Sequence, residues 1–205
     1  MLKFFFGPHS CALASHIALE ESGLPYEAVR LDLAAGDQKK PDYLKINPKS
    51  RVPALVTDRG ALTENPAILA YIAQSAPKAK LAPLDDPYAF GKIQAFNAYL
   101  CATVHVNHAH GRRGYRWAEE QTSFDDMKRK VPETMAACFD LIEKEMFEGP
   151  WVAGADYSIA DPYLFTMESW MASDQIDPKR FPALLDHRRR MEQRPAVQRV
   201  LPLHG

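Results

Sequence analysis

The sequence has few cysteines, almost no net charge and no long apolar run. Its three cysteines are odd in number and widely spaced along 205 residues, so we expect no disulfide framework and a reducing compartment such as the cytoplasm. The net charge of −1 gives no reason to expect nucleic acid or an acidic membrane surface as a partner. No apolar run approaches the roughly 18–20 residues that span a bilayer.

Proline is absent from one long stretch of the chain. Nine of the sixteen prolines lie in the first 87 residues, and none lies between Tyr88 and Val131. Because proline interrupts helices and central strands, the first part is expected to hold short elements and the second long helices. The length allows one large domain or two small ones, at about 100–200 residues per domain. We expect a first domain at residues 1–77, a linker at 78–87 and an all-helical domain at 88–205.

In the first part, aromatic or alternating apolar runs predict strands, and capped runs with helical spacing predict helices. The first helix is expected to begin after Ser10 and to end at Gly23, the usual stop signal of a helix. The order β-α-β followed by β-β-α suits a small mixed sheet with helices on its faces. Strands are expected at Leu2–Phe6, 26–33, 54–57 and 61–63, a short helical stretch before Asn47-Pro48, and a last helix with Asn65 as cap and Pro66 at its first position.

The second part has apolar residues at helical spacing almost throughout. Ser158 and Asp161 precede an apolar run with the spacing of a capping box, in which each side chain accepts a free backbone N–H at the other end. We therefore expect a structural role for both residues. A last amphipathic helix is expected at Phe181–Arg194, with Pro195 ending it.

A candidate reactive thiol, Cys11, lies at the turn between the first strand and the first helix. The free N–H groups and the positive dipole end of a helix favour thiolate over thiol, so this position is expected to lower the cysteine pKa. No second cysteine lies three residues away, which excludes an internal Cys-x-x-Cys exchange. The alternative is an inert buried cysteine, the role we expect for Cys101 and Cys138 within apolar helical patterns.

Two short motifs are typical of binding sites. Val52-Pro53 lies directly before a strand, where a cis peptide bond would leave the Val52 backbone free for an extended peptide; an ordinary trans turn is the alternative. Glu64-Asn65 puts a carboxylate and an amide at a helix N-terminus, which is a ready anion site or a simple cap.

Histidines and arginines crowd one later stretch. His105 and His108 have the spacing of one helix face, but no Cys, Asp or Glu completes a metal-ligand set within the next turn, so no metal is expected. Residues 111–116, Gly-Arg-Arg-Gly-Tyr-Arg, would steer anionic substrates into a cleft or form a solvated loop.

Taken in order, these motifs resemble the cytosolic glutathione transferases over essentially the whole chain. Among the subclasses the sequence is most similar to the bacterial beta class, in which a cysteine replaces the Tyr or Ser used elsewhere. The resemblance implies a thioredoxin-like first domain, an all-α second domain and a homodimer with two sites. It is carried by the segments around Cys11, Asn47-Pro48, Val52–Leu55, Leu62–Ile68, Trp151–Gly154 and Ser158–Phe165.

The same resemblance implies a site for glutathione as co-substrate. Val52 would offer backbone hydrogen bonds to the cysteinyl part of glutathione beside a cis Pro53. Glu64 and Asn65 would hold the γ-glutamyl end, and Lys39 would reach the glycyl carboxylate. The family usually has Ser after the Glu, so Asn65 is a departure from its pattern.

By resemblance, Cys11 and His105 would lie against the glutathione sulfur. The expected function is a transferase that activates the glutathione thiol for attack on electrophilic, mostly apolar small molecules. Two alternatives stay open. One is a glutathione-dependent disulfide reductase, dehalogenase or ether-cleaving lyase of the same fold. The other is a non-catalytic member that binds ligands or a protein partner.

Overall fold

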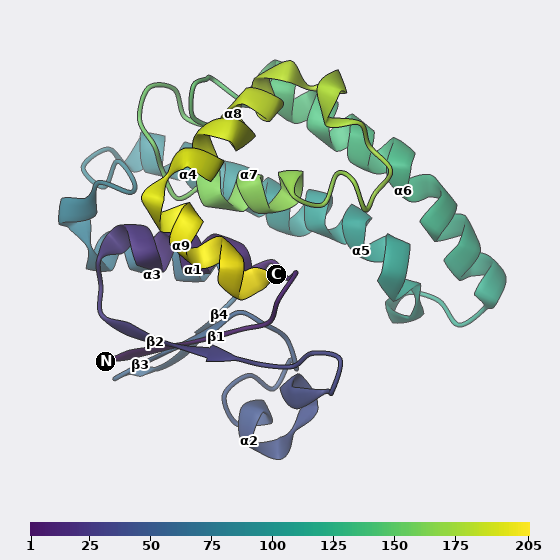
Figure 1. Ribbon diagram of the computed structural model, residues 1–205, viewed down its shortest axis with the longest axis horizontal. Helices are drawn as coiled ribbons and strands as arrows, with labels where there is room; N and C mark the ends of the chain where they lie inside the picture. The colour runs from purple at the N-terminus through teal and green to yellow at the C-terminus, as the bar shows by residue number, and fades with distance from the viewer.

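A four-stranded sheet forms one side of the molecule and a group of long helices the other (Figure 1). The computed structural model describes residues 1–205. The sheet has the order β2-β1-β3-β4, with β1 parallel to β2 and antiparallel to β3, and β3 antiparallel to β4. The strands are β1 Leu2–Phe6, β2 Tyr26–Arg30, β3 Ala54–Thr57 and β4 Gly60–Thr63.

The central strand β1 carries the buried face of the sheet. Phe4 pairs with Ala28 on one side and with Leu55 on the other, and Phe4 and Leu55 are fully buried. The strand β2 is three residues shorter than expected. It ends early because the Asp32 carboxylate accepts hydrogen bonds from the N–H groups of residues 34 and 35, which turns the chain away from the sheet.

Two helices of the first part cover one face of the sheet. The helices α1 (Ala12–Ser22) and α3 (Asn65–Ser75) lie on the side of the helical part, and α2 (Pro41–Leu44) lies on the opposite side (Figure 1). As expected, α1 ends at Gly23, whose φ of 68° is the left-handed conformation that glycine adopts without steric cost. The predicted Asn65 cap is wrong, because Glu64 occupies the N-cap position and Asn65 is already helical.

The second part begins with one long, nearly continuous helix. The helices α4 (Pro87–Tyr99) and α5 (His105–Arg113) are joined by a π-helical turn at Leu100–Val104, and π turns often occur at functional sites. The helices α5 and α6 run side by side (Figure 1). The remaining helices are α6 Gln121–Leu141, α7 Asp161–Glu168, α8 Pro182–Gln193 and α9 Pro195–His204.

The helix α9 corrects the expectation that Pro195 ends the last helix. Proline fits the first position of a helix, where its missing N–H has no helical partner to lose, so Pro195 begins α9 instead of closing α8. The helix α9 packs along α1 (Figure 1), where Arg194 pairs with Glu21 at 2.6 Å and His204 Nε2 lies 2.9 Å from His16 Nδ1.

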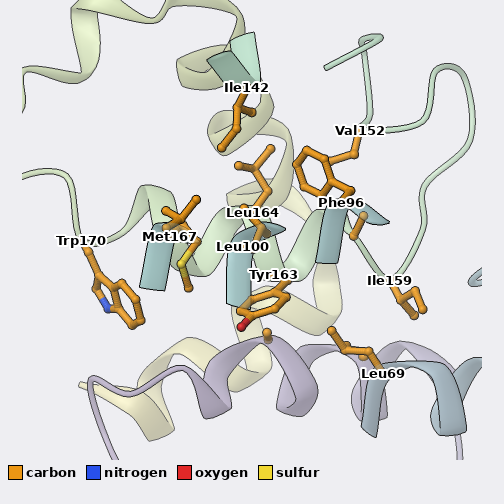
Figure 2. Packing of buried hydrophobic residues seen from close by; sticks show 14 of the residues in the cluster. Leu69, Phe96, Leu100, Ile142, Val152, Ile159, Tyr163, Leu164, Met167 and Trp170 are labelled. Atoms are coloured by element: carbon orange, nitrogen blue, oxygen red, sulfur yellow. The ribbon is translucent and has the colours of Figure 1, made fainter. Parts of the chain in front are cut away.

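The hydrophobic core is shared by both parts of the chain. One cluster of 33 buried residues includes Phe4 from the sheet and Leu69 from α3 as well as residues of the long helices. Figure 2 shows Leu69 together with Leu100 of the π turn and Tyr163 of α7. All residues of α7 are buried, so this helix is the centre of the helical part. None of the helices combines the length and the apolar character required to cross a bilayer.

Ser158 and Asp161 organise the start of α7. The Ser158 N–H donates to Asp161 Oδ2 at 2.6 Å, and the Ala160 N–H donates to Ser158 Oγ at 3.2 Å. A second Asp161 oxygen accepts the Val152 N–H at 2.8 Å, which holds the preceding loop against the helix. These bonds satisfy backbone donors that the buried helix end would otherwise leave free.

Candidate functional site

A cavity of about 350 Å³ lies where the first part of the chain meets the helical part. Six of the seven residues expected at a glutathione site line it: Cys11, Val52, Pro53, Glu64, Asn65 and His105. The exception is Lys39, which is exposed on the 3₁₀ turn Asp37–Lys39 and lies off the cavity wall. Its neighbour Gln38 and the cationic Arg51 line the cavity instead.

Cys11 is held as a protonated thiol. Its Sγ donates to the carbonyl oxygen of Val52 at 3.6 Å. Burial raises the pKa of Cys11 to about 12, and the nearby Arg113 guanidinium opposes this shift only in part. The expected lowering of the pKa is therefore wrong, because desolvation of the thiolate outweighs the effect of the helix end. At neutral pH the Cys11 thiol is a hydrogen-bond donor.

The loop before β3 presents a free backbone edge to the cavity. The Val52–Pro53 peptide bond is cis, as expected. The Val52 N–H donates to no acceptor in the protein. The preceding carbonyl, that of Arg51, accepts the Tyr43 hydroxyl at 2.7 Å and Asn47 Nδ2 at 2.7 Å. Two buried side chains thus hold the loop through the Arg51 carbonyl, while the N–H of Val52, a residue that lines the cavity, stays without a partner.

Glu64 occupies a strained position at the mouth of the cavity. Its φ of 73° is rare for a residue with a side chain, and such strain of about 1–3 kcal/mol is typical of ligand sites. The carboxylate is exposed and pairs with Lys49, whose ammonium also donates to Thr63 Oγ1 at 2.7 Å. The strained backbone aims a carboxylate at the mouth, beside the start of α3.

Both polar atoms of the Asn65 side chain form hydrogen bonds within the protein. The amide Nδ2 donates to the Cys11 carbonyl at 2.7 Å, and Oδ1 accepts the Ser15 hydroxyl. The side chain therefore ties the start of α3 to the start of α1, and the residue is only 3% exposed. Its backbone N–H donates to no acceptor in the protein and lies at the N-terminal end of α3, next to Pro66, which has no N–H.

His105 is an uncharged group on the helical wall. It is the first residue of α5, and its ring packs on Trp170 with centroids 5.1 Å apart. Burial lowers its pKa to about 3, and the Arg113 charge adds to the shift. The neighbouring His108 instead pairs with Asp174 at 2.9 Å, away from the cavity. No group of three or more His, Cys, Asp or Glu residues is placed to hold a metal ion.

Cys101 and Tyr163 also line the cavity, although the sequence did not indicate either of them for the site. Cys101 was expected to be a core residue, yet it is half-buried and lines the cavity, whereas Cys138 is buried in the core as expected. The missed signal is its spacing, because Cys101 lies four residues before His105 and so one turn away along the same helix. Tyr163, in the first turn of α7, is 1% exposed and borders the cavity; burial raises its pKa well above the usual value.

The end of α5 and the 3₁₀ turn Gly114–Arg116 that follows it complete the wall. Arg113, Tyr115, Arg116 and Trp117 all line the cavity, and the last three are also exposed to solvent. The expected loop at residues 111–116 is wrong because these residues are helical, and the steering of anions stays a prediction. Arg112 is exposed and lies off the cavity. The side chains of these residues make no hydrogen bond or ion pair within the protein, so this wall carries two unpaired cations and two open aromatic rings.

The chain matches known proteins over its full length. The family models for the glutathione S-transferase N-terminal and C-terminal domains match residues 1–74 and 109–201. The sequence is 31% identical to glutathione S-transferase GstA of Escherichia coli O157:H7, over 100% of this chain and 99% of the relative.

Solved structures agree with this assignment. A glutathione transferase homologue from Sulfitobacter with bound glutathione superposes with a TM-score of 0.95 at 46% identity, covering 99% of this chain and 98% of the other. A bacterial beta-class enzyme from Sphingomonas chungbukensis superposes with a TM-score of 0.86 at 35% identity, with the same coverage. The expected fold, a thioredoxin-like domain followed by an all-helical domain, is confirmed, and the chain belongs to the glutathione S-transferase family.

Proposed function

We propose that the cavity binds glutathione and activates its thiol for attack on small electrophiles. The observation that carries the proposal is the convergence of the free Val52 N–H, the Cys11 thiol and the Glu64 carboxylate on one cavity. A free backbone edge fits a peptide, a thiol donor fits a sulfur anion, and a carboxylate fits an ammonium group. Structures of similar proteins with bound glutathione support the choice of peptide.

The charges of glutathione fit the first-domain wall. Its ammonium group would pair with Glu64, and its γ-glutamyl carboxylate would accept the free N–H of Asn65 at the start of α3. The cysteinyl backbone would pair with Val52. The glycyl carboxylate would meet Arg51, which lines the cavity where the more distant Lys39 does not.

Activation of the thiol then depends on donors that favour the thiolate. Cys11, which is protonated at neutral pH, would turn its S–H from the Val52 carbonyl to the glutathione sulfur. The neutral His105 would orient the sulfur from the opposite wall, and the Arg113 charge would lower the thiol pKa. In the transfer step the thiolate forms a C–S bond while the leaving group departs with the electrons of its bond to carbon.

A conjugation assay with 1-chloro-2,4-dinitrobenzene tests this role of Cys11. We expect Cys11→Ser, which keeps an O–H donor, to retain most of the turnover, and Cys11→Ala to lose about tenfold while still binding glutathione. Failure of the unchanged protein to bind immobilised glutathione would overturn the function and favour a non-catalytic member of the fold.

A second candidate is glutathione-dependent disulfide reduction, which the presence of Cys11 and Cys101 on one cavity supports. In this reaction two glutathione thiols are oxidised to glutathione disulfide while one substrate disulfide is reduced to two thiols. An assay with hydroxyethyl disulfide, run beside the conjugation assay, separates the two. The high pKa of Cys11 favours the transferase, because a thiol that stays protonated attacks disulfides slowly.

We further propose that the protein is a cytoplasmic, beta-class homodimer that detoxifies electrophiles. The similarity to the Sphingomonas beta-class structure supports the class, and three free cysteines suit a reducing compartment. Size-exclusion chromatography with light scattering tests the dimer, for which a mass near twice 23.1 kDa is expected.

A further inference from the structure

The cavity wall carries positive charge that the protein itself does not neutralise. Arg51, Arg113 and Arg116 all line the cavity, and none of them has an ion-pair partner. The only carboxylate on the cavity wall is that of Glu64, which is already paired with Lys49. The cavity therefore has an excess of cationic groups.

Arg113 is the most informative of these cations because it is half-buried. An unpaired charge that has lost part of its hydration is costly, and burial accordingly lowers the pKa of Arg113. The cost is removed when an anion binds beside the guanidinium, whose flat fork of N–H donors matches a carboxylate.

The carboxylates of glutathione, bound as proposed above, leave two of the arginines without an anionic partner. Its two carboxylates would be taken by the start of α3 and by Arg51, both in the first domain. Arg113 and Arg116 belong to the helical part and line the cavity from that side. Their charge is therefore available to the second substrate.

The helix α5 sets the spacing between the reacting sulfur and the free cations. His105, Ala109 and Arg113 are four residues apart and follow one face of α5, and all three line the cavity. At 1.5 Å per residue, the Cα atoms of His105 and Arg113 are about 12 Å apart along the axis. Side chains on a helix lean toward its N-terminus, so the guanidinium reaches back over the small Ala109. Between His105 and Arg113 this face of α5 carries only the small Ala109.

Aromatic side chains follow Arg113 on the cavity wall. Tyr115 is 66% exposed and Trp117 is 48% exposed, and both border the cavity. The Trp117 ring is steadied by an edge contact with His110, with centroids 4.4 Å apart. Flat open rings beside guanidinium groups suit a planar apolar body with an anionic substituent.

We infer that the preferred electrophile of this site is a planar apolar molecule that carries a carboxylate, which Arg113 and Arg116 bind while the electrophilic carbon faces the glutathione sulfur. The inference rests on the proposed transferase function. It assigns the substrate class that the helical wall selects.

Two chloronitroaromatics of nearly equal shape test the inference. One is 4-chloro-3,5-dinitrobenzoate. The other, 4-chloro-3,5-dinitrobenzotrifluoride, has a neutral trifluoromethyl group in place of the carboxylate. With either compound the glutathione thiolate forms a C–S bond at the carbon that bears chlorine, chloride leaves with the bonding electrons, and the thiol proton passes to solvent. After division by the uncatalysed rates, we expect kcat/KM to be at least about tenfold higher for the benzoate.

Substitutions of the two arginines test whether they cause the preference for the benzoate. Arg113→Gln and Arg116→Gln should each lower kcat/KM for the benzoate several-fold more than for the benzotrifluoride, and the double variant should remove the preference. Arg112→Gln is the matched control, because it removes the same charge one residue away from the cavity wall. It should leave both rates unchanged.

The outcomes separate this inference from the function on which it rests. Conjugation of both compounds without preference for the benzoate overturns the inference and keeps the transferase. Equal loss of both rates in Arg113→Gln overturns it as well, because the arginine would then serve only the thiolate. If neither compound is conjugated and glutathione does not bind, both the function and the inference fail.

Discussion

The cavity has two walls, one from the first domain and one from the helical part, and their side chains differ in whether they form hydrogen bonds within the protein. On the first-domain wall, buried polar side chains donate hydrogen bonds to backbone carbonyls of the protein. Asn65 donates to Cys11, and Tyr43 and Asn47 donate to Arg51. On the helical wall, the side chains at 113 and 115–117 make no hydrogen bond within the protein and stand open to the cavity.

Because of this difference, the first-domain wall is fixed in shape, whereas the helical wall can vary in its substrate preference. Side chains that bond the backbone from behind cannot move without exposing buried polar groups, so the first wall suits one unchanging peptide. The unpaired side chains of the second wall cost little to rearrange or replace. The second wall is therefore where substrate preference can change without loss of the fold.

The largest predicted effect concerns Cys11 in the first wall. Because burial raises its pKa to about 12 from a usual 9.0, its thiolate fraction at pH 8 should be about a thousandfold lower than that of an ordinary thiol. Alkylation by iodoacetamide should be correspondingly slow and should accelerate about tenfold per pH unit up to pH 10, followed by mass spectrometry of the peptide that contains Cys11. An alkylation rate within tenfold of that of N-acetylcysteine would contradict the prediction, because it would show that burial does not suppress the thiolate.

The next largest effect is predicted for Asn65→Ala. The change removes one of the donors to the Cys11 carbonyl, which still accepts a backbone N–H of α1 at 3.3 Å, and leaves the buried Ser15 hydroxyl without its acceptor. The free energy of unfolding should therefore fall by about 1–3 kcal/mol in urea titrations. Glutathione binding, measured by calorimetry, should weaken with it. Asn107→Ala is the control in the helical part, where the amide donates only to Cys138 Sγ at 3.3 Å. Equal losses in the two variants would contradict the contrast between the walls.

Tyr43→Phe should have a smaller effect in the same wall. The Arg51 carbonyl loses one of its two donors but keeps Asn47, so about 1 kcal/mol of unfolding free energy should be lost. Because the loop that carries Val52 is then held less firmly, we expect glutathione affinity to fall a few-fold. Unchanged affinity at lowered stability would mean that the loop does not need this support to bind.

The smallest effect on stability is predicted for Arg113→Met in the helical wall. The change removes a half-buried cation without a partner and keeps an apolar stem, so the free energy of unfolding should stay within about 0.5 kcal/mol or rise. Thermal and urea unfolding measure it, with Arg112→Met as the exposed reference. A loss above about 1 kcal/mol would reveal that Arg113 supports the fold, and the contrast would fail.

Elements set by neighbouring residues could be predicted from the sequence. The strand Leu2–Phe6 was expected with the bounds it has, because its aromatic run ends at Gly7-Pro8. The Val52-Pro53 and Glu64 positions were found because each is a short motif next to a predicted strand or helix.

What depends on distant contacts could not be predicted. Burial in the folded protein raises the pKa of Cys11, and Arg113 and Cys101, about a hundred positions later, modify it through their charges, which no local pattern reports. The direction of the Asn65 side chain is set by Ser15 and the Cys11 carbonyl, again across the fold. The helix α9 was missed for a different reason, since proline both ends helices and begins them.

The packing of α9 on α1 also determines when α1 can be enclosed during synthesis of the chain. The buried contact between His16 and His204 joins residues 188 positions apart. At about 5–20 residues per second, the ribosome makes α9 roughly 10–40 s after α1. Until then Ile17, which packs in a small cluster with Val197 and Val200, has no cover from α9. The helix that begins beside Cys11 is among the first segments synthesised and among the last to be enclosed.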